Sequence, residues 1–189
     1  MCSSDLIGRV VGSIFQDPQR QFFSSELEDK IAFGCENYSF LKFDIQKRTK
    51  DAIHRMGLES IGNISLDLLS SGEKQRTAVA SVYAMYPQVF VFDEPTANLD
   101  KNGIIQMKNI LVELKKSGYT LLIAEHRISW IGELADKYLY MEDGQIQRQY
   151  SPSEFSAMNN CERISKGLRC IADIPFSKLI APSQTDSIK

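Results

Sequence analysis

Short apolar runs alternate with longer amphipathic stretches along this chain, and the alternation predicts strands and helices in turn. Residues 10–15, 89–92 and 120–124 are rich in the branched and aromatic residues that favour strands. Four amphipathic helices are predicted between and after them: from about residue 25, from near residue 44, from residue 70 to just before Pro87, and from about 102 to 116. We therefore expect an α/β domain with a mostly parallel sheet.

Local signals set the expected ends of these elements. Ser25 followed by Glu28 has the spacing of a capping box and predicts the start of a helix that presents Leu27, Ile31 and Cys35 on one face. Gly57 and Gly118 are expected to end the helices before them. Residues 138–141 and 145–150 flank Asp143-Gly144, which predicts a hairpin. Residues 151–189 lose the periodicity, so we expect a tail or linker there.

Composition narrows the class of protein. The 189 residues carry 22 Lys and Arg against 24 Asp and Glu, so nothing predicts a nucleic-acid-binding surface. The four cysteines form no C-x-x-C pair, which favours free thiols in a reducing cytoplasm. No apolar run approaches the roughly 18 residues needed to cross a bilayer. The chain is therefore expected to be soluble.

The clearest candidate chemistry lies at the end of residues 89–92. This apolar run leads directly into Asp93 and Glu94, which places two carboxylates at the carboxyl end of a buried strand. Open α/β sheets bind their ligands at that edge. One carboxylate there can hold a metal while the next aligns a water, and phosphoryl transfer requires both. Taken alone, the pattern fits equally well a buried strand followed by two solvated acids.

The neighbouring motifs favour the catalytic interpretation. They are, in chain order, Phe15-Gln16-Asp17-Pro18, Leu69-Ser70-Ser71-Gly72-Glu73-Lys74-Gln75-Arg76, Asp93-Glu94, Asn98-Leu99-Asp100 and Ala124-Glu125-His126. This ordered series resembles the Q-loop, signature, Walker B, D-loop and switch histidine of the ATP-binding cassette (ABC) ATPases. The resemblance covers roughly residues 8 to 150. It implies an ABC-type P-loop NTPase domain with a helical subdomain inserted over about residues 17–75.

The resemblance also implies roles and cofactors, namely ATP and Mg²⁺. Glu94 is expected to be the general base or to polarise the attacking water, and Asp93 to be a Mg²⁺ ligand. Gln16 would contact Mg²⁺ or the lytic water and sense a transmembrane partner, and His126 would contact the γ-phosphate. Asp100 would couple the two ATP sites of a dimer.

The signature motif departs from the family pattern at two positions. Its Ser70, Ser71 and Gly72 begin a predicted helix, and a helix N-terminus attracts anions. In the family this terminus binds the γ-phosphate held by the other subunit of a head-to-tail dimer. Ser71 stands where the family has Gly, and its side chain leaves less room between the backbone and the phosphate. Glu73 stands where the family has Gln, and it brings a carboxylate close to an anion site. Both departures are expected to slow the reaction.

A further departure is that the sequence contains no G-x-x-x-x-G-K-[ST] motif, whose lysine and backbone N–H groups hold the phosphates. In the family this P-loop lies well upstream of the Q-loop. We interpret its absence as truncation of an ABC cassette, leaving a partial domain over residues 7–150. Residues 1–6 read as the translation of a widely used sequencing adapter, so we expect a non-native leader; a genuine Ser-rich N-terminus is the alternative. The truncated chain alone is expected to be inactive.

Residues 16–23 and 31–37 point to one branch of the family. They resemble the ATPases of energy-coupling factor (ECF) transporters, which import vitamins and transition metals. Residues 166–169 resemble the segment that follows the first cassette in fused, two-cassette versions. The implied partners are a transmembrane coupling protein, a substrate-capture protein and a second cassette, fused or separate, at the inner face of the cell membrane.

Two other functions stay open at this point. One is a non-transport ABC ATPase, such as a translation or DNA-repair factor, which long coiled coils or basic segments would favour; neither is present. The other is a non-catalytic subunit or fragment that supplies only a signature half-site, against which the presence of Glu94 and His126 argues.

Overall fold

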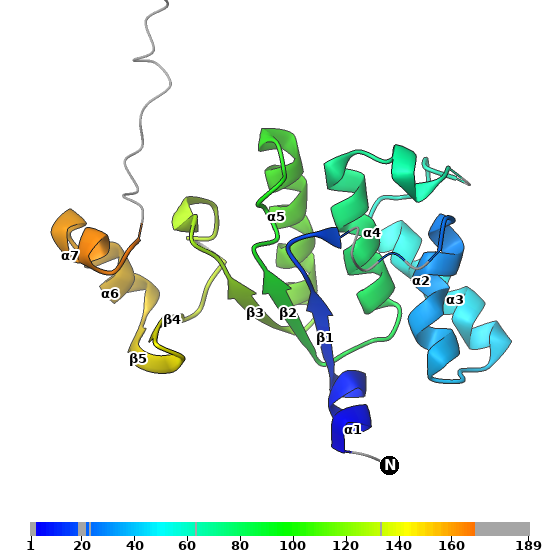
Figure 1. Ribbon diagram of the computed structural model, residues 1–189, viewed down its shortest axis with the longest axis horizontal. Coiled ribbons are helices and arrows are strands. Elements are labelled where there is room, and N and C mark those ends of the chain that lie inside the picture. The colour runs from blue at the N-terminus through cyan, green and yellow to red at the C-terminus, as the bar shows by residue number, and fades with distance from the viewer. Residues whose placement is uncertain (1–2, 19–21, 23, 63, 133, 169–189) are drawn as a thin grey trace, which may run out of the picture.

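A small parallel sheet lies at the centre of the molecule (Figure 1). The computed structural model describes residues 3–18, 22, 24–62, 64–132 and 134–168. The sheet has the order β1-β2-β3, with β1 at Val11–Ile14, β2 at Val89–Asp93 and β3 at Thr120–Ala124. Ile14 lies opposite Phe92, and Phe92 opposite Ile123, so the three strands end at the same edge. All three were predicted, and the expected α/β class is confirmed.

Helices pack in layers on one side of this sheet (Figure 1). The long helices α4 (Ser71–Tyr83) and α5 (Lys101–Lys116) lie beside the strands, and α2 (Leu27–Asn37) and α3 (Lys42–Arg55) pack against α4 further out. A short helix α1 (Ser3–Val10) precedes β1, and 3-10 turns occupy η2 (Leu66–Leu68) and η3 (Ile128–Trp130). In chain order α2 and α3 come between β1 and α4; the helical subdomain over about residues 17–75 stays a prediction.

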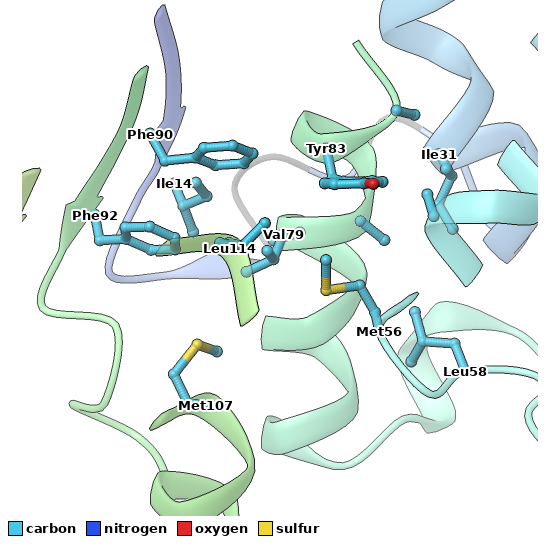
Figure 2. Close-up of a cluster of buried hydrophobic side chains, with 14 of the residues drawn as sticks. Ile14, Ile31, Met56, Leu58, Val79, Tyr83, Phe90, Phe92, Met107 and Leu114 are labelled. Atoms are coloured by element: carbon cyan, nitrogen blue, oxygen red, sulfur yellow. The ribbon is translucent and has the colours of Figure 1, made fainter. Parts of the chain in front are cut away.

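The core lies between the sheet and α4 and α5 (Figure 2). Phe90 and Phe92 point from β2 toward the helices and are fully buried, with Val79 of α4 and Met107 of α5 packed in the same cluster. Gly12 permits close packing of β1, because an added Cβ would lie 2.2 Å from Cγ1 of Val82. This packing fixes the strand that leads to Gln16.

The predicted start of α2 is wrong in one respect. The helix begins at Leu27, its N-cap is Glu26, and no side chain caps it. Ser25 lies one residue too early for a capping box, and its carbonyl accepts a hydrogen bond from the N–H of Leu66 at 3.0 Å. Ser25 therefore makes a hydrogen bond to a residue that is distant in the sequence and does not cap α2. The expected apolar face is confirmed, since Leu27, Ile31 and Cys35 are buried.

The last described part of the chain, residues 138–168, forms a hairpin followed by two short helices. Strands β4 (Tyr138–Glu142) and β5 (Gln145–Tyr150) pair antiparallel, as predicted, and Asp143 and Gly144 adopt the positive φ values of a tight turn. Within the segment expected to be a tail or linker, the structure forms two short helices that were not predicted, α6 (Pro152–Ala157) and α7 (Asn160–Ser165).

A capping signal that sequence reasoning passed over explains the first of these helices. Ser151 and Glu154 form a complete capping box at the start of α6. Phe155 of α6 then packs against Tyr138 and Tyr150 of the hairpin. The expectation for residues 169–189 lies outside the described residues.

Candidate active site

The carboxyl edge of the sheet brings three predicted side chains together. Gln16 follows β1 and donates from Nε2 to Oε2 of Glu94 at 3.0 Å. His126, which follows β3, has Nδ1 3.0 Å from Oε1 of the same carboxylate. The Glu94 and His126 side chains keep 30% and 45% of their exposure, so solvent reaches the cluster. One carboxylate is therefore held from both sides while it still faces water.

The backbone turns Glu94 out of β2 in an unusual conformation. Its φ is +43°, in the left-handed region that non-glycine residues seldom adopt. The N–H of Glu94 donates to the carbonyl of Ala124 at 2.9 Å, and its carbonyl accepts from the N–H of Ala97 at 3.1 Å. These two bonds hold a conformation that costs about 1–3 kcal/mol. Such strain concentrates at functional sites, where it aims a side chain.

A buried carboxylate next to His126 fixes the loop that carries the histidine. The Glu125 side chain is only 2% exposed. Its Oε1 accepts from the backbone N–H groups of His126 and Arg127 at 3.0 and 2.9 Å. Its Oε2 accepts from Oγ1 of Thr96 at 2.8 Å and from Nε1 of Trp130 at 3.2 Å. Glu125 thus ties the end of β3 to the turn after Glu94.

Arg127 adds a second connection between the end of β3 and the turn after Glu94. Its guanidinium donates to the carbonyl of Thr96 and, at 3.3 Å, to the Thr96 hydroxyl. Sequence reasoning missed these roles of Glu125, Thr96 and Arg127. Trp130 is partly buried against the core, and its indole N–H donates to Glu125.

Asp93 offers a single carboxylate at the carboxyl end of β2. Its side chain is exposed and makes no hydrogen bond or ion pair with the described residues. Among those residues no cluster of three or more His, Cys, Asp or Glu could hold a metal by itself. Mg²⁺ commonly takes one or two carboxylates and completes its shell with phosphate oxygens and water. The donor set fits a Mg²⁺ bound together with a phosphate, not a protein-only metal centre.

The signature motif forms the start of α4. Ser70 is the N-cap, and its hydroxyl accepts from the N–H of Glu73. Oε2 of Glu73 accepts in return from the hydroxyl and the N–H of Ser70, at 2.7 and 2.8 Å. These two hydrogen bonds hold the pKa of Glu73 below its usual value, and the bond from the Ser70 hydroxyl has the larger effect. The unexpected glutamate therefore completes a capping box at the terminus where an anion would bind.

The remaining predicted residues have other hydrogen-bond partners than the Glu94 cluster. In the described part of the chain, no hydrogen bond joins Ser70, Ser71 or Gly72 to Gln16, Glu94 or His126. Asp100 is the N-cap of α5, with Oδ1 accepting from the N–H of Gly103 at 2.7 Å. That bond is sufficient to explain an aspartate at this position, so the coupling role of Asp100 stays a prediction.

The sheet and its strand-end residues define an α/β domain of the P-loop NTPase class. Residues 3–97 match the family described as ABC transporter, and the chain belongs to this family.

Relatives place the chain near two named groups. It is 39% identical over 163 residues to a putative ABC transporter ATP-binding protein of Treponema denticola, which covers 86% of this chain and 33% of the relative. It is 35% identical to the energy-coupling factor transporter ATP-binding protein EcfA of Methanocaldococcus jannaschii, over 89% of this chain and 61% of the relative. The chain thus spans about a third of the first relative and less than two thirds of the second.

Two solved structures share the fold. CbiO1 from Clostridium perfringens, described as part of the ABC transporter complex CbiONQ, is 35% identical with a TM-score of 0.75, over 86% of this chain and 64% of that one. The cassette MJ0796, solved as a dimer bound to ADP and Pi, is 21% identical with a TM-score of 0.67, over 80% and 68%. The second similarity supports the fold alone.

Proposed function

We propose that this chain is part of the ATP-binding and ATP-hydrolysing subunit of an ABC importer of the energy-coupling factor type. MgATP-driven dimerisation of two cassettes would power the uptake of a vitamin or transition metal. The relatives named as ECF ATP-binding proteins support the branch. The observation that carries the ATPase activity is the Glu94 carboxylate held between Gln16 and His126 at the carboxyl edge of the sheet.

Each of the chain's own residues at this edge has a separate role in the proposed reaction. Bound MgATP supplies the γ-phosphoryl group and a cation that neutralises its developing charge. Glu94, whose side chain is 30% exposed, orients the attacking water and takes its proton. Gln16 and His126 hold the two carboxylate oxygens and so fix its direction. Asp93 provides the carboxylate for Mg²⁺.

The second cassette would complete the site through its signature. Ser70 and Ser71 are exposed and Gly72 is half-exposed at the start of α4, which supports a surface that serves a partner. The further partners are a transmembrane coupling protein and a substrate-capture protein at the inner face of the cell membrane. No helix in the described residues has the length and apolarity to span a bilayer, so a transport role requires such partners.

The remaining parts of the chain keep the roles that the sequence indicates. We propose a helical subdomain over about residues 17–75, a linker toward a second cassette after residue 150, and a non-native leader at residues 1–6. A second candidate function is a fragment that supplies only the signature half-site. The absence of a P-loop motif from the 189 residues favours it.

The test uses a completed cassette, defined as this chain preceded by a strand, a P-loop and a helix from an ABC relative. We expect MgATP hydrolysis, with Gln16→Ala and His126→Ala each lowering the rate. Glu113→Gln is the matched control, because Glu113 lies on α5 with its side chain 64% exposed. A completed cassette that binds MgATP but does not hydrolyse it would favour the half-site function instead.

A further inference from the structure

The turn after Glu94 is held at one buried residue, Thr96, whose exposed fraction is 0%. The carbonyl of Thr96 accepts from the N–H of Leu99 at 3.2 Å and from Nη2 of Arg127. The hydroxyl of Thr96 donates to Oε2 of Glu125 at 2.8 Å and accepts from the same Nη2 at 3.3 Å. Both oxygens of Thr96 are therefore in contact with the loop that follows β3.

Arg127 is fixed at both of its ends. Its backbone N–H donates to Oε1 of the buried Glu125 at 2.9 Å, and Arg127 is the N-cap of η3. Its guanidinium reaches Thr96, and the residue as a whole is half-buried. The side chain therefore forms a direct connection from the residue after His126 to the turn after Glu94.

This turn sets the backbone of Glu94. The N–H of Ala97 donates to the carbonyl of Glu94 at 3.1 Å, and the N–H of Leu99 donates to the carbonyl of Thr96, so two short turns follow each other. The φ of Glu94 is +43°. A non-glycine residue keeps such a conformation only where the surrounding structure holds it. Arg127 is bound two residues beyond Glu94, at the carbonyl where the two turns meet.

We propose that Arg127 is a positioning residue for Glu94. By binding the Thr96 carbonyl, it keeps Glu94 in the conformation that directs its carboxylate between Gln16 and His126. The catalytic consequence rests on the proposed function of Glu94, whereas the hold on the turn does not. Gln16 and His126 contact the carboxylate itself, so Arg127 acts at the opposite end of the same residue, on its backbone.

The charge of Arg127 suits this role. Hydrogen bonds from a charged donor are stronger than those between neutral groups. A guanidinium is not deprotonated in proteins, so its hold on Thr96 does not vary with pH. A single nitrogen, Nη2, makes both contacts with Thr96. The position therefore requires a charged donor at one point and does not depend on the planar fork of arginine.

Three variants of the completed cassette separate the donor from the packing of the side chain. Arg127→Met keeps the aliphatic length and removes the donors; we expect kcat for MgATP hydrolysis to fall by about tenfold or more, because a small displacement of a reacting group costs rate steeply. Arg127→Lys should stay within about threefold of wild type, because an ammonium can replace Nη2. The control Arg148→Ala, exposed on β5 over the Tyr150 ring, should change kcat less than about twofold.

Two further measurements distinguish positioning from a general loss of stability. The nucleotide affinity of Arg127→Met should change less than about twofold, because the residue acts through Thr96 and Glu94. In the Glu94→Gln background, Arg127→Met should change the residual turnover less than about twofold, because there is no carboxylate left to position. A role in fold stability alone would lower turnover by the same factor in both backgrounds.

Hydrogen exchange of the full 189-residue chain tests the hold on the turn without ATP. The amides of Ala97 and Leu99 donate within the two turns, so they should exchange faster in Arg127→Met than in wild type or Arg127→Lys. The amides of β4 and β5 should be unchanged.

The proposal is overturned by wild-type turnover in Arg127→Met, by equal losses in Arg127→Met and Arg127→Lys, or by the same loss in both Glu94 backgrounds. Unchanged exchange at Ala97 and Leu99 would also overturn it. A completed cassette that does not hydrolyse MgATP would contradict the proposed function instead, and the exchange measurement then decides the role of Arg127 by itself.

Discussion

Replacing Glu125 with glutamine tests how the fold holds the loop that carries His126. The wild-type carboxylate is buried and accepts four hydrogen bonds, two at each oxygen. Glutamine keeps the shape but has one oxygen and one NH₂ group. If the oxygen faces the N–H groups of His126 and Arg127, the NH₂ group faces Thr96 and Trp130. The threonine hydroxyl can rotate to accept, but the indole N–H can only donate.

The expected loss of stability follows from the indole N–H of Trp130, which would face an NH₂ group and have no acceptor. A buried donor without an acceptor costs about 1–3 kcal/mol, and the bonds that remain lose the strength that the negative charge gave them. We therefore expect Glu125→Gln to lower the free energy of unfolding of the completed cassette by about 1–3 kcal/mol or more. Turnover should also fall, because the backbone at His126 is held less firmly.

Urea denaturation of five proteins separates this mechanism from a general loss of charge. The proteins are the completed cassette, Glu125→Gln, Trp130→Phe and the double variant, with Glu113→Gln as the exposed control. The phenylalanine removes the indole donor, so the double variant should be less destabilised than the sum of the two single variants. Strictly additive costs, or a Glu125→Gln cost no larger than that of the control, would refute the proposed role of Glu125.

Three further predictions concern the signature, acid stability and the chain alone. Ser70→Arg in the completed cassette should abolish ATP-driven dimerisation by light scattering and leave monomer nucleotide affinity near normal; a large loss of monomer affinity would place Ser70 in its own site. The folded pKa of Glu73 is lowered, so its stabilisation is present above the unfolded value and is lost as pH falls below about 4.5. The stability difference between wild type and Glu73→Gln should therefore shrink in acid, and a constant difference would contradict the capping role. The 189-residue chain alone should be inactive, because it contains no P-loop motif to hold the phosphates; MgATP hydrolysis above background would contradict this.

Local pattern was sufficient for the sheet and for the residues at its edge. Strands β1, β2 and β3 are continuous apolar runs, and their parallel pairing alone brings Gln16, Glu94 and His126 to one edge. The hairpin was equally predictable, because Asp143-Gly144 fits only a turn with positive φ.

Features that depend on distant contacts could not be predicted in this way. The Ser25 signal failed because its carbonyl pairs with Leu66, which is far along the chain. The buried acceptor role of Glu125 depends on Thr96 and Trp130, and no local pattern brings those two residues together. Helix α6 was missed for a different reason: its capping box is local, but it lies in a segment too short for periodicity.

The most direct test of the proposed ATPase activity compares the completed cassette with its Glu94→Gln variant. Glutamine preserves size and hydrogen bonding at the position between Gln16 and His126 but cannot take a proton. The predicted result is a loss of MgATP turnover on the order of 10²–10⁴, with nucleotide affinity unchanged and the ATP-bound dimer accumulating. Near-wild-type turnover in Glu94→Gln, alongside an unchanged Glu113→Gln control, would contradict the assignment of Glu94 as the catalytic base.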